Sequence, residues 1–111
     1  MNDDYVLLML VCPARRRDDV VDALMACPAI SGFTMSQCGG FSRDHNRLSL
    51  REQVQGFGNF ERFEVVASPA TIVDVKQQLA VTAGRDDFHY WIYPILEQGS
   101  LQAAAVPAEP D

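Results

Sequence analysis

The sequence has no apolar run long enough to cross a membrane, which takes about 20 consecutive apolar residues in a helix. Its opening apolar stretch covers only residues 6–12, and Asp3 and Asp4 precede it where a secretory signal would carry positive charge. We therefore expect a cytoplasmic protein that does not insert into membranes.

Cysteine pairs are also lacking. The three cysteines, Cys12, Cys27 and Cys38, are odd in number and form no C-x-x-C motif. This pattern fits a cytosolic protein, because thiols are kept reduced there. We expect Cys12 and Cys27 to be buried, since a free cysteine behaves as a small hydrophobic residue.

Positive charge is scarce. The chain carries 9 lysine and arginine residues against 15 aspartate and glutamate residues, for a net charge of −6. Arg15, Arg16 and Arg17 form one basic cluster, and Asp18 and Asp19 follow at once, so we expect these charges to cancel on a helix surface. Nucleic-acid binding needs clustered cations, and we therefore expect no nucleic-acid partner.

A catalytic constellation is missing as well. Ser36, Ser42 and Ser49 have no evident base and orienting group beside them. Asp86 and Asp87 form a carboxylate pair, but they precede a strand in a turn, where acidic residues are common. We expect a binding protein, with a small-molecule enzyme as an alternative.

What the sequence does contain is an alternation of strand and helix patterns. The first strand pattern is apolar throughout, as in a strand covered on both faces. Ser68 and Pro69 indicate a helix start and Gly84 its end, while Pro94 cannot donate a sheet hydrogen bond and places its strand at an edge. The expected strands cover residues 6–12, 30–41, 60–66 and 88–96, and the expected helices cover residues 14–27 and 69–84.

This order, β-α-β-β-α-β, predicts a ferredoxin-like α+β sandwich. Right-handed crossovers place the first and third strands in the middle of an antiparallel sheet and both helices on one face. We expect one domain over residues 1–100. The Ala- and Pro-rich residues 101–111 show no pattern and predict a flexible C-terminal tail.

The third strand has two unlike faces. Phe63, Val65 and Ala67 alternate on one side and predict the core. Because the helices cover only one face of the sheet, the alternate residues lie on an open face with a large apolar area, which is typical of a partner or ligand surface. The open-face residues of this strand are Phe60, Arg62, Glu64 and Val66.

One interpretation of the open face is an RNA-recognition module that binds single strands. Residues 55–63 partly match the third-strand signature of such modules, K/R-G-F/Y-G/A-F-V-x-F/Y. Gln55 replaces the cation, Asn59 interrupts the aromatics, and Glu61 and Glu64 lie where phosphates would pass. This interpretation remains the alternative to self-association.

The self-association interpretation comes with a family resemblance. Leu-Ser-Leu-Arg-Glu-Gln-Val-Gln-Gly at 48–56 and Tyr-Trp-Ile-Tyr-Pro-Ile-Leu-Glu-Gln-Gly at 90–99 resemble the P-II-like signalling proteins, which include the nitrogen regulatory proteins, and the related CutA-type divalent-ion tolerance proteins. Residues 5–13, 31–34 and 62–65 add to the likeness. The chain is most similar to a small proteobacterial P-II-like group of uncharacterised function, often encoded beside heavy-metal efflux systems.

The resemblance implies a homotrimer whose open sheet faces, with Phe60, Arg62, Glu64 and Val66, pack around a three-fold axis. It implies a regulatory or sensory role in heavy-metal resistance, with a heavy-metal efflux component or another regulated protein as partner. The chain lacks a tyrosine modification motif and the basic cluster used on ATP phosphates, so no nucleotide cofactor is implied. A T-loop analogue at residues 42–55 would meet partners through Arg43, Asp44, His45, Arg47, Arg51 and Glu52.

A metal site is a separate hypothesis. Cys38 and His45 flank a Gly39-Gly40 bend, and a thiolate with an imidazole suits zinc, copper or a similar divalent ion. Two ligands are too few for a closed site, so Asp44, a water or another subunit would have to complete it. The alternative is that Cys38 is an ordinary small strand residue.

We expect a Cys38→Ser, His45→Ala double variant to lose zinc or copper affinity and keep its assembly, because it lacks both the thiolate and the imidazole. Calorimetric titration of each metal into the native protein and the variant measures the difference. Superimposable titration curves would exclude a site at these residues.

Overall fold

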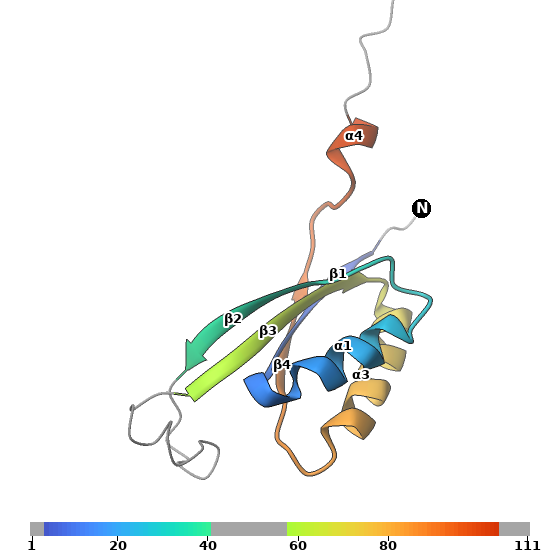
Figure 1. Ribbon diagram of the computed structural model, residues 1–111. Helices are drawn as coiled ribbons and strands as arrows, with labels where there is room; N and C mark the ends of the chain where they lie inside the picture. Colours follow the sequence, from blue (N-terminus) through green and yellow to red (C-terminus); the bar gives the residue numbers. More distant parts are fainter. Residues whose placement is uncertain (1–3, 41–57, 105–111) are drawn as a thin grey trace, which may run out of the picture.

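The computed structural model describes residues 4–40 and 58–104, which form one antiparallel sheet with helices along one of its faces (Figure 1). Within these residues no helix is both long enough and apolar enough to cross a membrane. In chain order the elements are β1 (Val6–Pro13), the 3-10 turn η1 (Ala14–Arg16), α1 (Arg17–Met25), β2 (Thr34–Gly40), β3 (Gly58–Ala67), α3 (Pro69–Ala83), β4 (His89–Pro94) and α4 (Leu101–Ala104).

The strand order β2-β3-β1-β4, with every neighbouring pair antiparallel, confirms the predicted ferredoxin-like arrangement. The apolar β1 lies in the middle, beside β3, and the two remaining strands form the edges. Pro94 is the last residue of the edge strand β4. A proline is tolerated there because its missing N–H interrupts no hydrogen bonds in the centre of the sheet.

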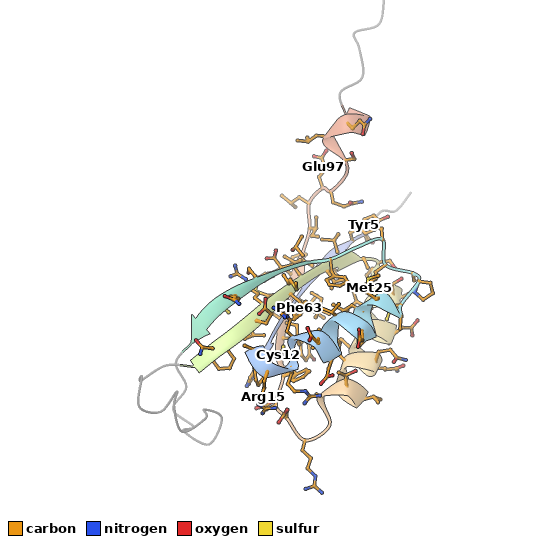
Figure 2. All side chains as sticks on the ribbon, in the orientation of Figure 1. Tyr5, Cys12, Arg15, Met25, Phe63 and Glu97 are labelled. Atoms are coloured by element: carbon orange, nitrogen blue, oxygen red, sulfur yellow. The ribbon has the colours of Figure 1, made fainter. Side chains whose placement is uncertain are left out.

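The core lies between the sheet and the pair α1 and α3. Leu8 and Leu10 of β1 stand opposite Val65 and Phe63 of β3, and all of these side chains are buried. Figure 2 shows Phe63 and Cys12 between the sheet and α1. The predicted alternation of β3 is therefore confirmed. The helices contribute the buried residues Val20, Leu24, Ile72, Val75, Leu79 and Ala83.

Helix α3 begins and ends where its local sequence signals lie. The Ser68 hydroxyl accepts a hydrogen bond of 3.2 Å from the backbone N–H of Thr71, and Pro69 occupies the first helical position. At the other end Gly84 has a φ of +60°, a conformation that favours glycine.

The first helix and the second strand are shorter than predicted. A 3-10 turn precedes α1, which begins at Arg17 and not at residue 14. After α1 the Ile30 N–H bonds to the Cys27 carbonyl at 3.3 Å, so the chain is still turning at residue 30 and β2 begins only at Thr34. Strand boundaries are poorly marked in sequence when apolar residues continue through a turn.

Arg16 ties the start of α1 to the end of α3. Its guanidinium donates to the carbonyl oxygens of Thr82 and Ala83, which are among the last carbonyls of α3, and to the Asp86 carboxylate. It also lies 5.3 Å from the centroid of the Phe88 ring. The pairing predicted within the charged cluster is present for Arg16 with Asp19 at 2.9 Å and Arg17 with Asp18 at 3.2 Å, whereas Arg15 pairs with Asp86 beyond α3.

Asp86 is the acidic centre of this contact. Arg15 binds the carboxylate oxygen Oδ2 at 3.2 Å, and Arg16 binds the same oxygen. The hydrogen bonds from Arg15 and Arg16 lower the pKa of Asp86, because they favour the charged carboxylate. The same partnership with Asp86, together with Asp19, raises the pKa of Arg16.

We expect Asp86→Asn to lower the free energy of unfolding by about 1–2 kcal/mol near neutral pH, because charge-assisted hydrogen bonds are lost. The pKa of Asp86 is lowered in the folded state, so its contribution is present above the unfolded carboxyl pKa of about 4 and disappears as the pH falls through the folded pKa. Urea unfolding at about pH 7 and about pH 3 measures the deficit.

Asp18→Asn is the matched control. The Asp18 side chain is 85% exposed and pairs with Arg17 on the surface, so its loss should cost less than about 1 kcal/mol. An Asp86→Asn protein as stable as the native protein near neutral pH would contradict the structural role given to Asp86. A loss in free energy of unfolding at about pH 3 as large as the loss at about pH 7 would contradict it as well.

Beyond β4 the chain leaves the body of the fold. The Ile95 N–H bonds to the Tyr5 carbonyl at 3.4 Å, and the following residues run away from the sheet to α4 (Figure 1). The region predicted as a patternless tail therefore contains one helical turn, at Leu101–Ala104. Leu96 and Leu101 on this C-terminal arm are almost fully exposed.

Candidate interaction surface

The sheet face opposite the helices carries a mixed apolar and charged pattern. Its residues come from β1, β3 and β4, and strand register places them directly across from one another. The cross-strand rows are Leu7 with Val66 and Tyr93, Met9 with Glu64 and Trp91, and Val11 with Arg62 and His89. We call these residues the open face.

Large apolar side chains are exposed on the open face. Trp91 is 48% and Tyr93 is 45% exposed, although both belong to a strand paired along its length with β1. Leu7, Met9 and Val11 beside them are only half-buried. A contiguous apolar surface of this kind is typical of a partner interface, because monomers seldom leave such patches in water.

The open face also holds two charges of opposite sign. Arg62 is exposed, and Glu64 is half-buried and accepts a hydrogen bond of 3.3 Å from the Thr34 hydroxyl. Within residues 4–40 and 58–104, neither side chain has an oppositely charged group at ion-pair distance. As far as the described residues go, both charges are therefore without an ion-pair partner.

Phe60 faces the same side but is already buried, with 6% of its surface exposed. Its ring lies against Gly40, where an added Cβ would come within 3.0 Å of the ring atoms. A residue other than glycine at position 40 would have to displace the ring. Phe60 can thus add little new buried area to an interface, and its predicted interface role remains untested.

Cys38 lies on β2 opposite Phe60 and is half-buried beside Gln37, Gly39 and Asn59, which line a shallow hollow. Its predicted partner His45 lies outside the described residues. The rest of the predicted partner loop, Arg43, Asp44, Arg47, Arg51 and Glu52, lies outside them as well. No group of three or more His, Cys, Asp or Glu side chains suited to a metal occurs in the part of the chain that the structure describes.

Of the two cysteines predicted to be buried, Cys12 is buried and Cys27 is partly buried, and all three cysteines are free thiols. Cys12 is fully buried, and Glu61 stands opposite it on the helix-facing side with only 3% exposure. Burial, followed by the nearby Glu61 charge, raises the pKa of the Cys12 thiol to about 12. The thiol form of Cys12 is therefore favoured at neutral pH.

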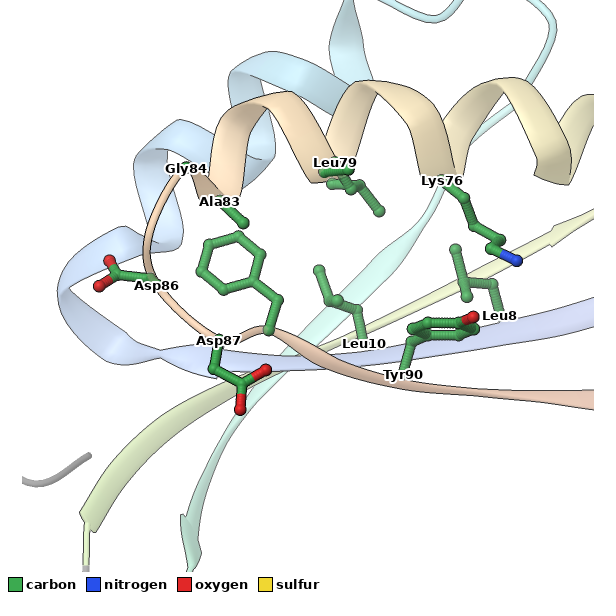
Figure 3. A pocket seen from close by; sticks show the side chains of 11 residues that line it. Leu8, Leu10, Lys76, Leu79, Ala83, Gly84, Asp86, Asp87 and Tyr90 are labelled. Atoms are coloured by element: carbon green, nitrogen blue, oxygen red, sulfur yellow. The ribbon is translucent and has the colours of Figure 1, made fainter. Parts of the chain in front are cut away.

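Sequence patterns gave no indication of one further concave feature. A groove of about 410 Å³ lies between α3 and the strands β1 and β4, with Lys76 and Tyr90 at one end (Figure 3). Lys76 lies beside the apolar stripe of α3, a position that is usually solvated, and only the fold brings it onto Tyr90.

The fold has solved counterparts. A crystal structure of a DUF3240 family protein from Shewanella baltica OS155 is similar, with a TM-score of 0.75 and 28% identity over 89% of this chain and 98% of that one. A Bacillus cereus protein related to NIF3 has a TM-score of 0.66 at 14% identity, over 87% of this chain and 27% of that one, which is a likeness of fold alone. A comparison with curated proteins found no match.

The strongest link is at the level of sequence family. The family described as "Protein of unknown function (DUF3240)" matches residues 2–102, which is nearly all of the chain. The chain belongs to the DUF3240 family.

Proposed function

We propose that this protein is a P-II-like regulatory or sensory binding protein that assembles as a homotrimer through its open face. The observation that carries the proposal is the placement of Arg62 and Glu64 among exposed aromatic residues, with no counter-charge at ion-pair distance from either within the described residues. A surface with this pattern is complementary to a second copy of itself.

Symmetry gives the charges partners. In a closed homo-oligomer every copy presents the same surface, so Arg62 of one copy can meet Glu64 of the next around the ring. The apolar residues beside them, Trp91 and Met9 foremost, then exclude water from the ion pairs. Water exclusion strengthens charge-assisted hydrogen bonds and makes a missing partner costly.

The C-terminal arm supplies a second contact in this proposal. Leu96 and Leu101 are almost fully exposed in their own chain, and the arm that carries them runs away from the sheet to α4 (Figure 1). Arms of this kind gain stability by packing against a neighbouring subunit, which removes their apolar surface from water.

The regulatory role rests on the family resemblance. In this proposal the connection at residues 42–55 meets the regulated protein, and a heavy-metal efflux component is the expected class of partner. Gly40 of β2 and Gly58 of β3, which lead into this connection, lie beyond the Val11, Arg62 and His89 row that the proposed assembly uses.

The RNA-recognition alternative has less support. Such modules stack bases on exposed aromatic side chains of the central strands. Here Phe60 belongs to the segment that partly matches the signature and faces the open side, but it is buried. The exposed Trp91 and Tyr93 lie on the edge strand β4. Glu64 adds negative charge where a phosphate backbone would pass.

The proposal is tested by Glu64→Ala. In the trimer this change leaves a desolvated Arg62 without its partner, which typically costs about 3–5 kcal/mol for a fully buried pair. We expect sedimentation equilibrium of the native protein to give about three times the 12.3 kDa of one chain. The variant should dissociate at much higher concentration.

Asp18→Ala is the matched control, because Asp18 is an exposed acid on α1, away from the sheet, and its loss should cost on the order of 0–1 kcal/mol. Both variants are compared at one salt concentration, since salt screens exposed charges more than buried ones. If Glu64→Ala dissociated no more readily than Asp18→Ala, the open face would not be the interface.

A further inference from the structure

The groove between α3 and β4 has an apolar floor and side walls. Leu8 and Leu10 of β1 form the floor, and Leu79 and Ala83 of α3 form one wall (Figure 3). Phe88 also lines the groove, and the Arg16 guanidinium lies 5.3 Å from its ring centroid. The volume of about 410 Å³ falls within the range of small-molecule sites, roughly 300–1,000 Å³.

Lys76 stands at one end of this groove. Lys76 is the only lysine in the sequence, and its ammonium lies 4.8 Å from the centroid of the Tyr90 ring. Among the described residues no carboxylate lies within ion-pair distance of Lys76. Within the described part of the chain, the partner that the ammonium has is the face of an aromatic ring, which is a weak partner for a charge.

The opposite end of the groove is acidic and already paired. Asp86 is held by Arg15 and Arg16, and Asp87 lies 3.2 Å from the His89 ring nitrogen Nε2. Figure 3 shows both carboxylates at the end away from Lys76. Because Arg15 and Arg16 already neutralise Asp86, the described lining offers an anion a cation without a carboxylate partner only at Lys76.

We propose that the groove binds a small amphipathic carboxylate, such as a medium-chain fatty acid. The carboxylate pairs with the Lys76 ammonium, and the apolar chain lies over Leu10 and Leu79 towards Ala83 and Phe88. A ligand that enters draws the ammonium from the Tyr90 ring to its own carboxylate, because an ion pair in an apolar groove is stronger than a contact with an aromatic face.

This site is separate from the proposed oligomer interface. The groove lies on the helix-facing side of β4, where Tyr90 points, and Trp91 and Tyr93 of the open face point to the other side. A variant that abolishes ligand binding in the groove should therefore still assemble, and a variant that prevents assembly should still bind the ligand.

Decanoate is a suitable probe, titrated below its micelle-forming range into the full chain by calorimetry. We expect saturable binding, with octanoate about tenfold weaker, because each buried methylene contributes roughly three- to fourfold in affinity. Lys76→Met keeps the apolar stem and removes the charge, so decanoate affinity should fall at least about tenfold while decanol affinity stays unchanged. Arg85→Met is the control, because it removes an exposed charge from the neighbouring turn and should leave the affinities for decanoate and decanol unchanged.

A second variant tests the groove without touching the charge. Ala80 lines the groove and is exposed, so Ala80→Leu should fill space there and weaken decanoate binding at least about tenfold without disturbing the core. Val81→Leu, on the same helix but outside the groove, is its control. The proposal is wrong if the native protein does not bind decanoate, or if Lys76→Met and Ala80→Leu bind it as tightly as the native protein.

Discussion

The pairing of β1 with β3 at the centre of the sheet is the constraint on which the rest of the structure depends. Leu8 opposite Val65 and Leu10 opposite Phe63 commit these faces to the core beneath α1 and α3. Because side chains alternate along a strand, the same register sends Arg62 and Glu64 to the opposite side. The open face is therefore a direct consequence of how the core is built. A shift of one residue would bury both charges under the helices.

Features that depend on local sequence could be predicted, and contacts between distant segments could not. The cap at Ser68, the stop at Gly84 and the edge position of Pro94 follow from the chemistry of single residues. Strand order follows from the alternation of elements and the handedness of crossovers. By contrast, Arg16 meets Asp86 across 70 positions of sequence, and no local pattern marks that contact.

The candidate sites divide in the same way. Alternation along β3 was enough to place Arg62, Glu64 and Val66 on one face. The burial of Phe60 could not be foreseen, because it depends on a glycine of β2 that only the sheet brings beside it. The contact of Lys76 with Tyr90 could not be foreseen either, because the tyrosine lies on another element. The two faces of β4 thus serve two proposed roles, with assembly on one side and a small ligand on the other.

The most direct test of the account is the accessibility of Trp91, the only tryptophan in the chain, to a neutral quencher. In a single chain its side chain is 48% exposed, in the middle of the open face. If copies of the chain cover that face, Trp91 fluorescence should be shielded from acrylamide at high protein concentration and become accessible as dilution separates the subunits. Quenching at the level of a half-exposed side chain, unchanged from the highest to the lowest concentration, would contradict the account.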